Sequence, residues 1–558
     1  MWWAWPHLRR LWAAVGTITL GLVGTWLYSL LSEQALPHLR IASFLLHDYW
    51  PWLGAGLLAL TTVSIVAERA HRQHAAFRFR HALYQNVLHD SLTDGRRVEL
   101  HRRIAECEEP AYGQQASDIA GELAHHYGSG KQPAKAAEYL SRMAEQAAAR
   151  CAFAEAITHA RAGLALIPEL HSDPQCSHRE FELLPTLVTA ATALEGWDSA
   201  QASAGRERII ELARASGDEV ELATAFAAAW VEHLSAGRYE QSLEMAHQMV
   251  SLAERRQHPS ALADAQTALG WTGVWMGRIS EAQEAFDRAL ALCPDGVGRM
   301  SLIGMHPMVE LHCFFEQANC AAGRLERALR SLEFNLQRAR ELKQPFSLCM
   351  SLFAGSWTLA ERGELEAAGR LAQEGAAVAR QGGYPSLLAG CNYVEGWAVS
   401  QLGQTEHGIA LIRDGIANWT MRMCKYQHVM LADAHLCAGQ YSDALVALNT
   451  YRELANINGE HFGDSEAERL EAKALMLMDP GSASSAEQHL RRAIAIATEQ
   501  GAKTFELRAT TSLARLLRDT VGREEGRTML SAIYNWFTEG FDTRDLKEAK
   551  TLLDELSN

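Results

Sequence analysis

The chain has 558 residues and a formal net charge of -15, which is enough length for several domains or one long solenoid. Runs rich in Val, Ile and Thr are scarce, which excludes a large sheet, and the ten cysteines include no C-x-x-C pair, which excludes the common zinc and redox motifs. Five arginines against three acidic residues in the first 73 positions leave the remainder near -17, and such an acidic body excludes general nucleic-acid binding.

Two apolar runs stand near the N-terminus, at about residues 11–32 and 49–67. Each approaches the roughly 20 residues that cross a bilayer as a helix, and tryptophans flank both runs. A secretory signal peptide is the alternative for the first run, although its apolar stretch is long and a second run follows. Arginines lie before the first run and after the second. We therefore expect residues 1–75 to be a two-helix transmembrane anchor in the lipid bilayer, with both termini in the cytoplasm.

Residues 76–130 follow as a helical junction with many basic side chains. Arg96, Arg97, Arg102 and Arg103 form a basic patch shortly after the predicted anchor. Contact with anionic lipid headgroups is one interpretation, and a solvated helix face is the other.

The end of this junction offers two weak signs of a ligand site. The stretch Gly128-Ser129-Gly130-Lys131-Gln132 resembles a phosphate-binding loop, but it lacks a preceding strand, an earlier glycine and a Ser or Thr after the lysine. We interpret it as a turn that ends a helix. His125 and His126 are adjacent and should point to different helix faces, so we predict no metal site and no cofactor.

A helical hairpin is clearest at residues 269–294, LGWTGVWMGRISEAQEAFDRALALCP. Gly277 ends the first helix, and Ala282, Phe286 and Ala289 recur at the three- and four-residue steps of a second. The order of large and small residues resembles a tetratricopeptide repeat.

Turn glycines recur along the chain in a way that an irregular helical domain does not predict. They stand at Gly196, Gly237, Gly277, Gly323, Gly363, Gly403, Gly439 and Gly522, with Gly481 as a looser candidate. Several are followed five residues later by a small residue. The spacing of roughly forty residues fits helical solenoids. We predict an all-α fold, a right-handed superhelix of tetratricopeptide-like hairpins over residues 131–530, with a capping helix at 531–558.

Tryptophans repeat within these hairpins. Trp271, Trp357 and Trp397 each stand six residues before a turn glycine, and Trp275 follows one turn after Trp271. Equivalent positions of a solenoid line one surface, and the first helices usually line the concave one. These four residues are therefore a candidate surface for a protein partner. Packing between repeats is the alternative, because it also needs large apolar residues at a fixed register.

From about residue 77 to the C-terminus, the chain resembles a bacterial family. The matching stretches are residues 79–83 (FRHAL), 100–104 (LHRRI), 119–126 (IAGELAHH, position 121 aside), 396–398 (GWA), 408–410 (GIA), 536–543 (WFTEGFDT) and 545–549 (DLKEA). They resemble the tetratricopeptide-like C-terminal region of AAA/STAND ATPases and class III nucleotide cyclases used in signalling. The ATPase and cyclase domains of that family would lie upstream, where this chain has the two apolar runs instead.

Two functions are compatible with this pattern. The first is a non-catalytic scaffold at the bacterial inner membrane, whose cytoplasmic repeats bind a protein partner on the concave surface. The second, implied by the resemblance, is the regulatory part of an ATPase or cyclase system whose catalytic domain is on another chain. We expect no enzymatic activity, because no catalytic constellation can be assembled from the sequence.

Overall fold

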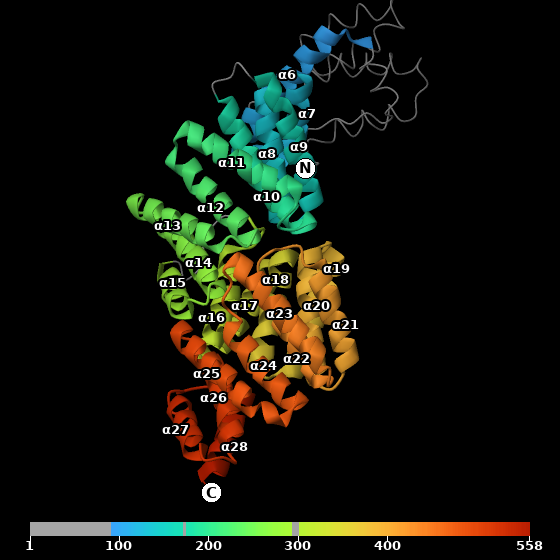
Figure 1. Cartoon of the computed structure of the whole chain (residues 1–558). Coiled ribbons are helices and arrows are strands. Elements are labelled where there is room, and N and C mark those ends of the chain that lie inside the picture. The colour runs from blue at the N-terminus through green and yellow to red at the C-terminus, as the bar shows by residue number, and fades with distance from the viewer. Residues whose placement is uncertain (1–90, 171–174, 293–300, 558) are drawn as a thin grey trace, which may run out of the picture. The chain divides into compact units, whose positions relative to one another are not determined.

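The structure is a computed structural model that describes residues 91–170, 175–292 and 301–557. Helices are labelled as in Figure 1. They form two units, residues 91–143 with 166–170 and residues 144–165 with 171–558, and each unit is described by itself. All regular elements in the described ranges are helices, so the predicted all-α class is confirmed.

The first unit contains the end of the predicted junction. Its elements are α6 (Asp94–Tyr112), η2 (Gly113–Ile119), α7 (Ala120–Ser129), the first part of α8 (Pro133–Ala149) and η3 (Ile167–Leu170). Tyr127 and Tyr139 stack in its core, with ring centroids 5.9 Å apart. The phosphate-loop lookalike is the turn between α7 and α8, as predicted, because α7 ends at Ser129 and α8 begins at Pro133.

The second unit is a stack of helical hairpins. Its helices are α9 (Phe153–Leu166), α10 (Cys176–Glu195), α11 (Ala200–Ser216), α12 (Glu219–Ser235), α13 (Tyr239–Arg255), α14 (Pro259–Trp275), α15 (Ile279–Leu292), α16 (Pro307–Ala321), α17 (Leu325–Leu342), α18 (Pro345–Glu361) and α19 (Leu365–Gly382). They continue as α20 (Pro385–Gln401), α21 (Thr405–Asn418), α22 (Gln427–Cys437), α23 (Tyr441–Asn458), α24 (Asp464–Met478), η4 (Pro480–Ser482), α25 (Ala483–Gln500), α26 (Lys503–Leu517), α27 (Arg523–Tyr534) and α28 (Arg544–Ser557).

Proline and glycine set many of these helix boundaries. Proline is the first residue of α14, α16, α18 and α20, where its missing N–H costs no helical hydrogen bond. The second helices α11, α19, α23 and α25 end at a glycine in the left-handed conformation, which a residue with a Cβ adopts at a cost. Both kinds of residue lie at the turn that joins one hairpin to the next.

The hairpin predicted at residues 269–294 is present as α14 and α15. Ala282, Phe286 and Ala289 are buried on the face of α15 that meets α14. A Cβ built on Gly270 would lie 2.7 Å from the Phe286 ring, so the helices cross closely where the sequence placed small residues. Successive hairpins also pack against one another, and together they form one apolar core that extends from Ala144 to Phe505.

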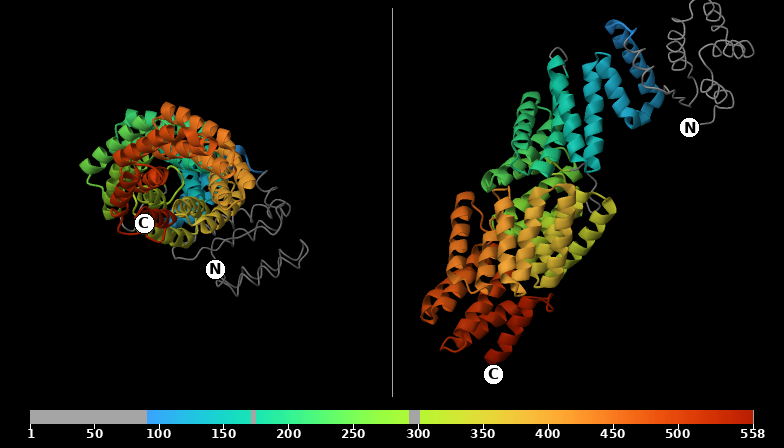
Figure 2. Two further views of the ribbon diagram at one scale, coloured as in Figure 1. Left: turned by 60° about the horizontal axis from the view of Figure 1, so that its bottom comes forward. Right: turned by 90° about the vertical axis from the view of Figure 1, so that its right-hand side faces the viewer.

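Helices far apart in the sequence also pack together within this unit. Figure 2 (left) looks along the stack and shows the helices of the second unit following one another around a common axis. After one circuit the chain meets its own earlier hairpins. The Tyr239 hydroxyl, for example, donates to Glu460, 221 residues later, over 2.8 Å. The superhelix is therefore wound tightly enough for successive turns to touch.

No helix within the described ranges is both long and apolar enough to cross a membrane. The two runs predicted as transmembrane helices, at about 11–32 and 49–67, lie outside the described residues. This finding contradicts the expected localisation at a bacterial inner membrane.

Candidate functional site

The four tryptophans of the predicted partner surface lie in the interior. Trp271, Trp275, Trp357 and Trp397 keep 1%, 2%, 2% and 6% of their surface exposed. Trp271 stacks on Phe314 of the next hairpin, with ring centroids 3.6 Å apart, and meets Trp230 of the previous one edge-on. These tryptophans therefore pack between repeats, which was the alternative interpretation of their spacing.

A second layer covers the concave side of the first helices. Tyr426 stacks on Trp357 with a centroid distance of 5.5 Å, and Phe462 meets Trp275 at 5.6 Å. Both covering rings come from segments of the next superhelical turn, before α22 and α24. The expected concave groove is therefore filled at α14 and α18 by the chain itself, and these tryptophans present no surface to a partner.

The contact between the two superhelical turns also supplies hydrogen-bond donors to the C-terminal ends of helices. The last carbonyl groups of an α-helix lack partners within the helix. Trp275, the final residue of α14, accepts backbone N–H groups of His461 and Phe462 at 2.9 and 3.2 Å. The Cys320 carbonyl near the end of α16 accepts the Thr504 hydroxyl at 2.5 Å. We call this contact the inter-turn seam, formed by the C-terminal ends of α12, α14, α16 and α18 with residues 420–426, 458–463, 500–508 and 537–545.

The most strongly charged part of the seam surrounds Arg508 on α26. Its guanidinium donates to the Glu361 carboxylate at 2.8 Å, to the Glu361 carbonyl at 2.7 Å and to Asp545 at 2.6 Å, and Glu466 lies 3.6 Å away. Burial alone would lower the pKa of Arg508, but the three carboxylates raise it well above its ordinary value. The group is a fixed cation that joins α18, α24, α26 and α28.

Sequence reasoning missed this network. Glu361 and Arg508 stand 147 residues apart, and each alone resembles an ordinary helix-surface charge. The only available signal was an acidic residue two positions before the turn glycine Gly363, which is too common to single out.

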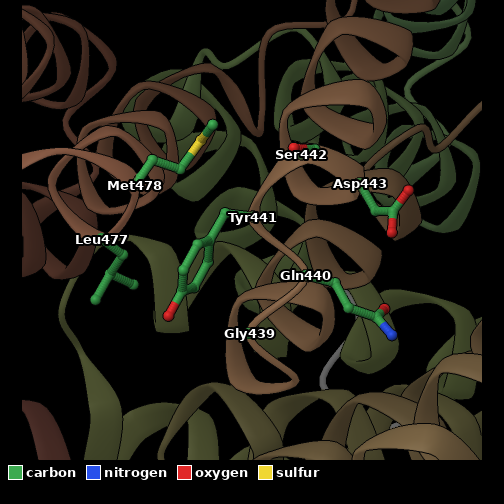
Figure 3. Close-up of a pocket in the computed structure, with 7 residues that line it drawn as sticks. All are labelled: Gly439, Gln440, Tyr441, Ser442, Asp443, Leu477 and Met478. Atoms are coloured by element: carbon green, nitrogen blue, oxygen red, sulfur yellow. The ribbon is translucent and has the colours of Figure 1, made fainter.

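A shallow hollow of about 460 Å³ lies on the surface of the second unit. It is lined by Gly439, Gln440, Tyr441, Ser442, Asp443, Leu477 and Met478. Figure 3 shows the Tyr441 ring next to Leu477 and Met478, while Gln440 and Asp443 lie on the other side. Leu477 and Met478 are 47% and 49% exposed. The hollow thus has an apolar side and a polar side, at the start of α23 and the end of α24.

The predicted basic patch is electrically balanced. Arg97 pairs with Asp94, Arg102 with Glu99 at 2.5 Å, and Arg103 with Glu99 at 2.8 Å. Helix α6, which also carries Arg96, has four arginines and five acidic residues, so its formal charge is -1. Lipid-headgroup contact by these arginines stays a prediction, and α6 lacks the excess positive charge that motivated it.

Two groups of side chains in the described residues have the proximity needed to hold a metal ion: His101 with His125 and His126, and Glu468 with Glu471 and His489. In the second group Arg452 already lies 3.3 Å from Glu468 and also pairs with Glu471, and Arg492 lies 3.8 Å from Glu468. Those arginines neutralise the carboxylates that a cation would need. In the first group no carboxylate takes part.

No family model matches the chain, and a search of curated proteins finds no match. Solved structures of helical-repeat proteins do match. A Rap protein complexed with competence and sporulation factor is 10% identical, covers 65% of this chain and 99% of its own, and has a TM-score of 0.48. The Cut9–Hcn1 hetero-tetramer of the APC/C is 11% identical, covers 82% and 90%, and has a TM-score of 0.44. The relation to AAA/STAND ATPases and cyclases stays a resemblance.

Proposed function

We propose that this chain is a non-catalytic helical-repeat protein that binds a peptide segment of a partner protein in the hollow between α23 and α24. The supporting observation is the exposure of Leu477 and Met478 in a hollow that Asp443 lines on its opposite side. Exposed apolar groups that gather in a concave place are typical of interaction sites. This location replaces the tryptophan surface, which is covered.

The chemistry of the hollow defines the partner. Leu477, Met478 and Tyr441 offer an apolar wall to one large apolar side chain, and methionine adapts to differently shaped groups. Asp443 has no hydrogen-bond or ion-pair partner among the residues that the structure describes. A lysine or arginine of the peptide would meet this carboxylate. The expected ligand is therefore a segment with an apolar residue close to a basic one.

A peptide selection tests the proposal. Random peptides displayed on phage would be selected on the purified full chain, and the enriched peptides synthesised and titrated. We expect them to combine an apolar and a basic residue. Changing Leu477 and Met478 together to serine should weaken binding more than tenfold, because a buried apolar side chain contributes about 1.5–3 kcal/mol. Asp443→Asn should selectively weaken peptides that carry the basic residue.

Ile457 gives a matched control. It lies at the other end of α23 and is 79% exposed, so Ile457→Ser removes an exposed apolar group from outside the hollow. The Ile457→Ser variant should bind the selected peptides with the same affinity as the unchanged chain. Peptides that bind all variants equally would refute the site. A natural partner that carries an ATPase or cyclase domain and competes with these peptides would favour the regulatory alternative over a general scaffold.

A further inference from the structure

Three histidine side chains converge where α6 packs against α7 in the first unit. His101 comes from α6, and His125 and His126 come from adjacent positions of α7. The ring centroids of the three pairs lie 5.4, 5.0 and 5.3 Å apart. One nitrogen of each ring lies within 4.8 Å of the other two. Side chains at adjacent helix positions normally point in different directions. The His101 ring lies close to both His125 and His126 and so brings the three rings into one group.

The closest approach joins the Nδ1 atoms of His101 and His126, which are 2.8 Å apart. Two imidazole nitrogens come this close when one donates its proton to the other. They also approach each other when both present a lone pair to a cation. A tetrahedral zinc ion with bonds of about 2.0–2.1 Å would hold the two nitrogens about 3.3 Å apart, so a small ring rotation converts one arrangement into the other.

The group of three histidines is open to solvent. The His125 side chain is exposed and the other two are half-buried, so an ion can reach the group from solvent.

We propose that His101, His125 and His126 together bind one divalent transition-metal ion of the zinc type, which ties α6 to α7. Imidazole nitrogens suit Zn²⁺ and its neighbours Co²⁺, Ni²⁺ and Cu²⁺, whereas Mg²⁺ and Ca²⁺ prefer oxygen. Three protein ligands leave a fourth position of a tetrahedral ion for water or another donor. This inference is independent of the peptide site, which lies in the other unit.

Cobalt titration of the full chain, stripped of metal by a chelator, tests the site. Tetrahedral Co²⁺ has visible absorption bands that its hydrated ion lacks. We expect one such Co²⁺ per chain, displaced by Zn²⁺. His125→Asn changes an exposed side chain and should leave the fold intact, and it should weaken Co²⁺ binding more than tenfold. His126→Asn should do the same, and Zn²⁺ should no longer slow hydrogen exchange in α6 and α7 of either variant.

His489→Gln is the matched control, because His489 belongs to the other group that could hold a metal. It should leave the affinity unchanged. Three results would overturn the proposal: no tetrahedral Co²⁺ spectrum in the unchanged chain, Co²⁺ affinity in the His125 and His126 variants as high as in the unchanged chain, or loss of the spectrum on His489→Gln.

Discussion

At the scale of single residues, Gly396 on α20 and Gly408 on α21 are the glycines of the described ranges whose added Cβ would lie nearest to backbone atoms. A Cβ built on Gly396 would lie 2.5 Å from the Gly408 carbonyl oxygen and 2.9 Å from the Ile412 backbone nitrogen. Backbone atoms cannot move aside as a flexible side chain can. Both glycines are needed for the space they leave, since neither has a positive φ.

Gly396→Ala should therefore destabilise the chain by about 1–3 kcal/mol, the usual cost of overfilling a packed core. Gly369 is the matched control, because it also lies inside a helix, α19, and nothing is within 4 Å of its added Cβ. Gly369→Ala should be stabilising by about 0.5–1 kcal/mol through the better helix propensity of alanine. Urea denaturation of both variants measures the difference. Equal midpoints would contradict the close crossing.

Local sequence signals correctly predicted the roles of many single residues within a hairpin. Gly277 ends a hairpin's first helix, and Ala282 and Phe286 face that helix, because each of these roles depends on neighbours a few residues away. The position of Trp357 did not follow from such signals. Its spacing predicts a register on the first helix of the hairpin, but whether that side of α18 faces solvent depends on Tyr426, which belongs to another turn of the superhelix.

At the scale of elements, the seam joins helices that are not neighbours in the stack. In an open solenoid each repeat contacts only the adjacent ones. Here α26 caps α16 through Thr504 and α18 through Arg508. The Glu539 carboxylate, in the loop before α28, accepts the N–H groups of Glu326 and Arg327 at the start of α17, the first of them 213 residues away. A negative charge at a helix N-terminus is favourable. The C-terminal part of the chain is therefore attached both through α26 and through the loop before α28.

Arg508→Met should destabilise the chain by about 3–5 kcal/mol, because it leaves Glu361, Glu466 and Asp545 close together without their shared cation. Arg518 provides the comparison. It directly follows the same helix, its side chain is 41% exposed and it pairs with Glu555 at 3.2 Å, so Arg518→Met should change stability far less than Arg508→Met does. Denaturant titration measures both, and similar losses would show that the seam contributes little.

At the scale of the whole second unit, contacts between superhelical turns could not be predicted from the sequence. The repeat pattern fixes the angle between hairpins only approximately, and a small change per hairpin decides whether the turns touch after a full circuit. Tyr239 and Glu460 carry no local sign of pairing. The residues of the surface hollow were missed for another reason, since Leu477 and Met478 at the end of an amphipathic helix resemble ordinary core positions.

The Tyr239–Glu460 contact should make stability depend on pH. Burial raises the pKa of Glu460 to about 7 from 4.5, although bonds from Tyr239 and the Lys425 N–H oppose the shift. A carboxyl group with a raised pKa stabilises the folded chain fully below about pH 4.5, and this contribution is lost as the pH rises through about 7. The contribution should fall by on the order of 1 kcal/mol per pH unit within that window.

Glu460→Gln isolates this group, because glutamine fills the same space and does not titrate. Stability of the unchanged chain and of the variant would be measured by urea denaturation at intervals from pH 5 to 8. The unchanged chain should lose stability more steeply than the variant between about pH 5 and 7. Both should keep the slope produced by other groups such as Glu310, whose pKa burial raises to about 8. Since Glu460 links two superhelical turns, hydrogen exchange at the start of α13 should accelerate over the same range in the unchanged chain alone. Parallel stability profiles would show that Glu460 does not couple the two turns to pH.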